Sequence, residues 1–204
     1  GDSFGEGKSV DPRFTIQERL SENGYNAISL SKAGNGPLTE FAVMLEYVKI
    51  IKPKYVFWLF NQFDLYDLNA ELNSQILTRY LYEENFSNNL INIQDKINSS
   101  WIGYYNRFKP VQNIPYRFVT LKKIRAMINE FILIKKYNSS LDKLKYNIFY
   151  NIIERTNDIV TGFGGELHFV ILPTYSELVN DSFIYDKNKF KKSIKKIIDG
   201  SIID

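Results

Sequence analysis

The run Tyr55-Val56-Phe57-Trp58-Leu59-Phe60 decides the fold of this chain. A nearly continuous apolar stretch of this length is expected of a strand that is buried on both faces of a parallel sheet. Lys52-Pro53-Lys54 stands directly before it, and its proline ends the preceding element. We therefore predict a central β-strand over 55–60.

A helix and an earlier strand precede this run. From Pro37 to Ile51 the apolar residues recur three and four apart, which places Leu38, Phe41, Leu45 and Val48 on one face of an amphipathic helix. Ala27 to Ser31, after the turn residues Asn23 and Gly24, predicts a short strand. Strand, helix and strand in this order form a βαβ unit and predict an α/β fold.

Three loops are expected to meet at one edge of this sheet. In an open parallel sheet, ligands bind beyond the carboxyl ends of the strands. Gly34 follows the first predicted strand, Asn61-Gln62-Phe63-Asp64 follows the second, and the segment around Ser3 completes the set. The candidate site therefore lies at this edge.

The segment Gly1-Asp2-Ser3-Phe4-Gly5-Glu6-Gly7 resembles the first motif block of the SGNH (GDSL-type) hydrolases, whose serine attacks esters. The resemblance implies a three-layer α/β/α, flavodoxin-like domain with Ser3 as the nucleophile. It also implies a buried strand directly before the motif, which this sequence lacks. We therefore expect a fragment that is truncated at both ends.

Two further blocks carry the resemblance. Residues 30–38 are similar to the second family block, which implies that the backbone N–H of Gly34 binds the oxyanion together with that of Ser3. Residues 60–68 resemble the third block, but the oxyanion asparagine of the family falls on Phe63 and the glycine before it falls on Gln62. Phenylalanine has no side-chain donor, and losing one oxyanion donor costs about 10²–10³ in turnover.

Two neighbouring amides are candidates for the missing donor. Asn61 carries the right group two residues upstream, and Gln62 is a longer alternative. The other interpretation is that both side chains only satisfy backbone groups at the end of a strand. Asn61 is kept as a candidate third oxyanion donor beside Ser3 and Gly34.

Composition limits the remaining possibilities. With 204 residues, 44% of them hydrophobic and 15% aromatic, the chain is expected to be one domain over 1–204 with a helical insertion at about 65–160. It contains no cysteine and one histidine, so we expect no disulfide, no metal site and no cofactor. A formal net charge of +3 does not indicate a nucleic-acid partner. No stretch is long enough to span a bilayer, and localisation and oligomeric state stay open.

The middle of the chain has a helical pattern. Helices are predicted over 68–82, 90–97, 118–136 and 141–161, with an irregular stretch at 84–89 and a glycine-rich end at 162–165. Because the insertion leaves the sheet at the carboxyl end of the strand 55–60, it is expected to act as a lid and specificity element. The aromatic residues of 101–115 are interpreted as the core of a subdomain, with a carbohydrate-binding surface as the alternative.

The C-terminal part supplies another strand and a basic helix. Residues 166–172 predict a strand that contains His168, which we interpret as a packed or hydrogen-bonded residue. The family takes its catalytic histidine from an Asp-x-x-His motif that these 204 residues lack, so Ser3 has no assigned base. Residues 186–198 predict an amphipathic helix with six lysines, and Ser201 begins a further strand.

Three functions follow from these patterns. The first is a serine ester hydrolase that removes small acyl groups, such as acetyl groups on a carbohydrate. The second is a non-catalytic relative that keeps the pocket as a binding module, with Phe63 filling the place of a donor. The third is a domain that binds anionic surfaces through the lysine-rich helix, which is otherwise a solvated outer helix.

Overall fold

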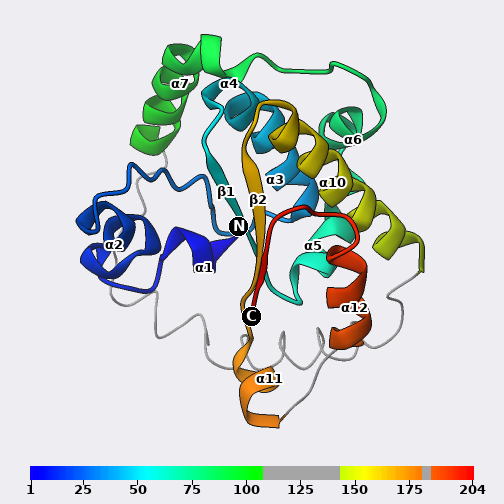
Figure 1. Cartoon of the computed structure of the whole chain (residues 1–204). Helices are drawn as coiled ribbons and strands as arrows, with labels where there is room; N and C mark the ends of the chain where they lie inside the picture. The colour runs from blue at the N-terminus through cyan, green and yellow to red at the C-terminus, as the bar shows by residue number, and fades with distance from the viewer. Residues whose placement is uncertain (108–142, 181–184) are drawn as a thin grey trace, which may run out of the picture. The chain divides into compact units, whose positions relative to one another are not determined.

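The computed structural model describes residues 1–107, 143–180 and 185–204, and these form a mixed α/β structure (Figure 1). Within them one sheet is formed by the parallel strands β1 (Tyr55–Phe60), β2 (Glu166–Ile171) and β3 (Ile202–Ile203), in that spatial order. Tyr55 lies opposite Glu166, and Phe169 lies opposite Ile202. The predicted α/β class, the strand over 55–60 and the strand that begins at 166 are confirmed.

The chain divides into two compact units, Gly1–Asn88 with Asp142–Asp204, and Asn89–Leu141. The described helices of the first unit are α1 (Ser3–Glu6), η1 (Pro12–Phe14), α2 (Ile16–Glu22), α3 (Pro37–Val43), the π-helical η2 (Met44–Val48), α4 (Lys49–Ile51), α5 (Asp64–Glu71), α6 (Gln75–Tyr82), α10 (Lys143–Gly162), α11 (Tyr175–Asn180) and α12 (Lys187–Ile194). Those of the second unit are η3 (Leu90–Ile93) and α7 (Gln94–Arg107).

The core lies on one face of the sheet. Alternate residues of β1 and β2 point toward α10 and α12, and Trp58, Phe60 and Phe169 are buried. The ring of Phe60 stacks on Phe190 of α12 at 4.9 Å, and Phe149 of α10 stacks on Phe190 at 5.8 Å. Because large rings remove the most apolar area from water, this aromatic cluster contributes strongly to stability.

The opposite face of the sheet is only partly covered. Tyr55 and Phe57 are 42% and 48% exposed, so the prediction that this strand is buried on both faces is wrong. The reason is that, within the first unit, α10 and α12 pack against the other face, while α1 lies against Leu59 on this one. On this face the ring of His168 stacks on Phe57 at 5.1 Å, and its Nδ1 lies 2.9 Å from Ser201 Oγ. The interpretation of His168 as a packed, hydrogen-bonded residue is confirmed.

Two predicted elements differ from the structure. Residues 27–31 form no strand, because within the described chain this stretch has no ladder of backbone hydrogen bonds, and its neighbour Lys32 donates a single one to the Gly1 carbonyl. The predicted helix over 68–82 is two helices. α5 ends at Glu71 and α6 begins at Gln75, since Ser74 caps the second helix by accepting the Leu77 N–H.

The helix predicted from Pro37 to Ile51 is confirmed as the continuous series α3, η2 and α4. The predicted helix over 141–161 matches α10, and Gly164 follows it with a φ of +84°. The irregular stretch at 84–89 is also confirmed. The predicted helix over 118–136 lies outside the described residues.

The aromatic residues of α7 are not a buried core in the described part of the second unit. Trp101 and Tyr104 are 65% and 57% exposed and stack on each other at 5.8 Å. The interpretation of these two residues as a subdomain core is therefore wrong, and the side chains of 105–115, which the same prediction covered, lie outside the described residues. None of the helices in the described ranges has both the length and the apolarity to cross a bilayer.

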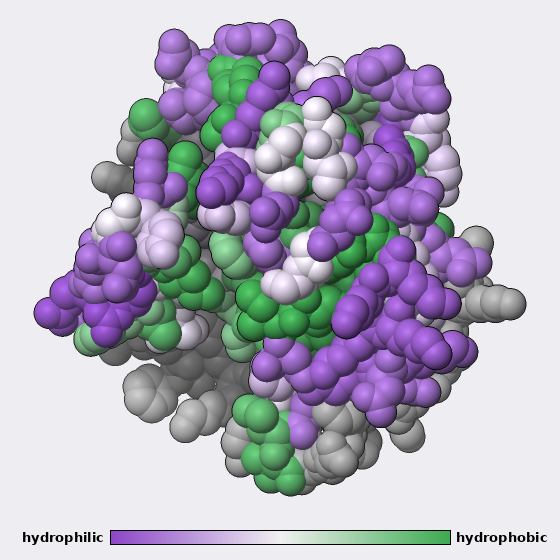
Figure 2. All heavy atoms as spheres, viewed as in Figure 1, coloured by the Kyte–Doolittle hydropathy of each residue, from purple (hydrophilic) through white to green (hydrophobic). Residues whose placement is uncertain are grey.

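The basic helix is shorter than predicted and is amphipathic. α12 ends at Ile194, buries Phe190 and Ile194, and presents lysines on its outer side, which is hydrophilic in Figure 2. Lys187 pairs with the carboxylate of Asp204 at 2.9 Å, and Lys191 pairs with the same group. Two of the six lysines therefore share one carboxylate within the chain, which offsets one of their two positive charges. A hydrophobic patch lies over α11, where Leu178 and Val179 are exposed (Figure 2).

Candidate functional site

Side-chain hydrogen bonds tie together the three loops expected at the edge of the sheet. We call residues 1–7 the first loop, 32–36 the second loop and 61–63 the third loop. Asn61 Nδ2 of the third loop donates to Asp2 Oδ2 of the first at 2.8 Å. Glu6 Oε2 of the first loop accepts the Ala33 N–H of the second at 2.8 Å. The structure therefore brings the three segments together.

Ser3 stands at the first position of α1. Asp2 caps this short helix by accepting the Phe4 N–H at 2.9 Å. An N–H at the start of a helix has no acceptor inside the helix. Within the described ranges no hydrogen bond engages either the Ser3 N–H or its hydroxyl, so both groups are available to a ligand.

Close packing fixes the first loop on the sheet. A Cβ on Gly5 would lie 2.3 Å from Ser31 Oγ and 2.8 Å from Leu59 Cδ1, so only glycine fits there. Gly1 is similarly close to the same two residues. The segment that carries Ser3 thus lies against both the stretch before the second loop and the strand before the third.

A salt bridge strengthens the contact between the first and second loops. Lys32 Nζ lies 2.5 Å from Glu6 Oε1, and the Lys32 N–H donates to the Gly1 carbonyl at 3.2 Å. The hydrogen bond from Lys32 and the one from the Ala33 N–H hold the pKa of Glu6 below its usual value. The Glu6 carboxylate is therefore an anchor that stays charged.

Gly34 occupies the turn of the second loop. The Asn35 N–H donates to the Lys32 carbonyl at 3.0 Å, and Gly34 has a φ of +89° between them. This left-handed conformation favours glycine. Gly34 is exposed, and a Cβ built on it would meet nothing within 4 Å, so its backbone is open to a ligand.

Glu71 of α5 holds the end of the second loop. Its carboxylate accepts the N–H groups of Gly36, Leu38 and Thr39 at 2.9, 2.9 and 3.1 Å. These donors form the N-terminus of α3, where a negative charge is favourable. A Cβ on Gly36 would lie 2.6 Å from Glu71 Oε2, so glycine is required for this close approach. Sequence reasoning missed Glu71, although its spacing from Asp64 and Asp67 places it on the same side of one helix.

The third loop is held by its own amide side chains. Asn61 is 2% exposed, donates to Asp64 Oδ1 at 3.1 Å as well as to Asp2, and accepts the Phe63 N–H at 2.8 Å. Gln62 donates to Thr174 Oγ1 at 2.8 Å, which connects the loop after β2. Phe63 is 44% exposed. The two amide groups therefore hold loops together, and the side chain that faces solvent is the apolar one.

Buried carboxylates lie beneath these loops. Glu40 is 7% exposed, and burial raises its pKa to about 7. Asp64 is fully buried, and burial together with the charge of Glu40 raises the pKa of this carboxyl well above its usual value. Burial and the neighbouring Glu71 raise the pKa of Asp67 to about 6. The loops thus rest on acidic groups whose pKa values are raised by burial.

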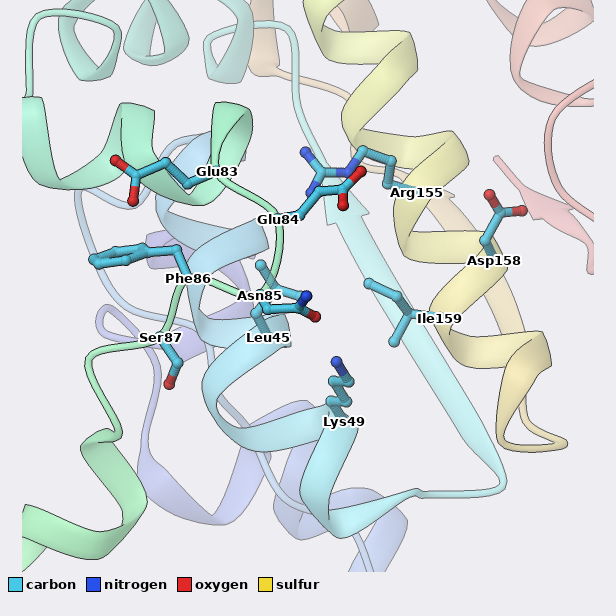
Figure 3. A pocket seen from close by; sticks show the side chains of 10 residues that line it. All are labelled: Leu45, Lys49, Glu83, Glu84, Asn85, Phe86, Ser87, Arg155, Asp158 and Ile159. Atoms are coloured by element: carbon cyan, nitrogen blue, oxygen red, sulfur yellow. The ribbon is translucent and has the colours of Figure 1, made fainter.

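The described residues contain no base for Ser3 and no metal centre. His168 bonds Ser201 through Nδ1, and its Nε2 lies 3.5 Å from Glu166 Oε2, so both nitrogens are engaged on the sheet face. No group of three or more potential metal-binding side chains occurs in the described ranges. A cavity of about 410 Å³ lies elsewhere in the first unit, and none of its lining residues belongs to the three loops (Figure 3).

Comparison with known proteins gives no relative of this chain. No family model matches it, and neither the curated proteins nor the solved structures contain a match.

Proposed function

We propose that this chain is the core of a serine ester hydrolase of the SGNH type, a flavodoxin-like three-layer α/β/α domain with a helical insertion. The observation that carries the proposal is the joining of the Ser3, Gly34 and Asn61 loops by direct side-chain hydrogen bonds. At their meeting point the hydroxyl and N–H of Ser3 are uncommitted. Loops of such different sequence position are joined in this way where a rigid scaffold presents a site.

The proposed chemistry is attack of Ser3 Oγ on the carbonyl carbon of an ester. The oxygen of the tetrahedral intermediate then accepts hydrogen bonds from the backbone N–H groups of Ser3 and Gly34. Asn61 stays the candidate third donor, but it donates to Asp2 and Asp64 in this arrangement, which favours a positioning role. The Ser3 hydroxyl must give its proton to a general base as the bond to carbon forms, and no side chain of the described ranges is hydrogen-bonded to this hydroxyl.

The substrate class proposed is a small acyl ester, such as an acetyl group on a carbohydrate hydroxyl. The open surroundings of Gly34 suit a substrate that reaches the site from solvent. Phe63 adds an exposed apolar ring to the third loop, where the substrate's acyl or sugar face would make contact.

A binding module without catalysis is the second candidate. It is favoured by Phe63, because an apolar ring stands where the resemblance places a hydrogen-bond donor, and by the engagement of both donors of Asn61. Such a protein would keep the joined loops as a pocket for an acylated ligand. The third candidate, an anionic-surface domain, is weakened by the pairing of Lys187 and Lys191 with Asp204.

Hydrolysis of p-nitrophenyl acetate by the complete gene product tests the proposal, with Ser3→Ala and Phe63→Asn as variants. We expect Ser3→Ala to abolish activity and Phe63→Asn to raise it, by up to about 10²-fold if the new amide becomes an oxyanion donor. Folded protein without serine-dependent activity on acetyl or longer acyl esters would instead support the binding module.

A further inference from the structure

The cavity of about 410 Å³ in the first unit carries an inference that does not depend on Ser3 (Figure 3). Its walls come from three segments, namely η2 with the start of α4, the irregular stretch 83–87, and α10. This volume is within the range of small-molecule sites, about 300–1,000 Å³. One wall is a π-helical turn, a rare feature that is frequent at functional sites.

Two residues of the cavity wall, Ser87 and Arg155, form hydrogen bonds to groups outside the cavity. Ser87 donates to the buried carboxylate of Glu46 at 2.9 Å, and Glu46 also accepts the Tyr80 hydroxyl at 2.6 Å. Arg155 donates to the Leu81 carbonyl at 2.6 Å and lies over the ring of Phe41 at 4.7 Å. Ser87 and Arg155 are therefore already ordered before a ligand binds, which lowers the entropic cost at these two positions.

The charges around the cavity balance. Arg79 neutralises Glu83 through two hydrogen bonds of 2.8 and 2.9 Å. Two cations, Arg155 and Lys49, and two anions, Glu84 and Asp158, remain around the cavity. Within the described ranges Lys49, Glu84 and Asp158 form no ion pair. Because the cations and anions are equal in number and interspersed, the site offers little net attraction to a phosphate or to a simple cation.

The side chains that point into the cavity combine polar and apolar groups. Lys49, Asn85 and Ile159 lie around its centre in Figure 3, with Leu45 on the η2 wall. Carboxylates accept hydrogen bonds, an ammonium group donates them, and an amide does both. Such a set matches the alternating hydroxyl groups of a sugar, while Leu45 and Ile159 suit the apolar C–H face of its ring.

We propose that this cavity binds a neutral sugar residue, as a glycan subsite separate from the loops around Ser3. The test is titration of the whole protein with methyl glycosides of glucose, galactose, mannose and N-acetylglucosamine, followed by calorimetry or saturation-transfer NMR. We expect one of them to bind with a Kd on the order of 1 mM, a weak affinity of about −4 kcal/mol.

Three variants locate this binding. Asp158→Ala should weaken it at least about tenfold, and Leu45→Trp should abolish it by filling the cavity without removing a polar group. Glu154→Ala is the matched control, because Glu154 is an exposed carboxylate of α10 outside the cavity. No binding of any glycoside up to about 50 mM by folded protein, affinity unchanged in both cavity variants, or binding of phosphate or glycine in place of sugars would overturn the proposal.

Discussion

The Asn61 amide nitrogen donates a hydrogen bond to the Asp2 carboxylate at 2.8 Å and joins two loops that are 59 residues apart in the sequence. Asn61 is almost completely buried, and its second amide hydrogen goes to Asp64. A buried amide group that makes all of its hydrogen bonds fixes the residues around it. When the amide is removed, its buried partners are left without hydrogen-bond donors. The position of Ser3, which follows Asp2 directly, therefore depends on Asn61.

Replacing Asn61 should destabilise the protein strongly. We expect Asn61→Ala to lower the free energy of unfolding by about 2–4 kcal/mol, since the carboxylates of Asp2 and Asp64 lose donors and Asp64 stays buried. Urea unfolding measures this change. The exposed Asn69 provides the control, for which Asn69→Ala should change stability by less than about 0.5 kcal/mol. Equal effects of the two substitutions would contradict the role given to Asn61.

Removing the Glu71 carboxylate should loosen the second loop. Three N–H groups at the start of α3 lose a charged acceptor in Glu71→Ala, so we expect a loss of about 1–3 kcal/mol. Glu71→Gln keeps one acceptor oxygen, so its free energy of unfolding should fall by less than that of Glu71→Ala. Thermal unfolding of both variants checks the order, and a Gln variant as unstable as the Ala variant would argue against an acceptor role.

The pH dependence of stability should show the buried Glu40. Because burial raises the pKa of Glu40 from 4.5 to about 7, the folded state holds this proton more tightly than the unfolded state. The contribution of Glu40 is therefore full below about pH 4.5 and disappears as the pH rises through 7. It amounts to at most about 3 kcal/mol.

Urea unfolding of the wild type and of Glu40→Gln at pH 5 and pH 8 isolates this contribution. We expect the wild type to lose more stability between the two pH values than the variant loses. Glu18→Gln, on an exposed position of α2, is the control and should follow the wild type. Parallel pH profiles for wild type and Glu40→Gln would contradict the raised pKa.

A methyl group at Gly5 should displace the first loop. Its Cβ would lie 2.3 Å from Ser31 Oγ, so Gly5→Ala is expected to cost about 1–3 kcal/mol. Gly103 gives the opposite case, because it is exposed within α7 and a Cβ there meets nothing within 4 Å. Gly103→Ala should be neutral or stabilise by up to about 1 kcal/mol. Calorimetry that ranks the two substitutions the other way would refute this packing.

The elements that were predictable from the sequence have a strong local pattern. Residues 55–60 and the helix from Pro37 to Ile51 carry continuous or periodic apolar positions, and both occur as predicted. The stretch 27–31 has the composition of a strand but no strand forms, because a strand needs a neighbour with which to pair its backbone groups. Likewise, the exposure of Tyr55 and Phe57 depends on which face the connecting helices cover, and no local pattern encodes that.

The proximity of the three loops was predicted from the sequence, but the contacts that hold them together were not. Asn61 follows a parallel strand, as its sequence position predicts, but residues 27–31 form no strand, so strand topology does not explain where Gly34 lies. The carboxylates of Glu6 and Glu71 hold the second loop in place instead. The partners of Asn61 and the capping role of Glu71 are long-range contacts between polar residues, which leave no periodic signal. The exposure of Phe63 was also not predictable from the local sequence, because its side chain is exposed although its neighbours Gln62 and Asp64 are buried.

Labelling with a fluorophosphonate tests the central claim, the nucleophilic character of Ser3, most directly. In this reaction Ser3 Oγ forms a bond to phosphorus and fluoride leaves, so the complete gene product should gain one label that peptide mass spectrometry assigns to Ser3. Ser3→Ala should prevent labelling, and prior incubation with an acetyl ester should slow it. Absence of label on folded protein, or a label on another serine that persists in Ser3→Ala, would contradict the account.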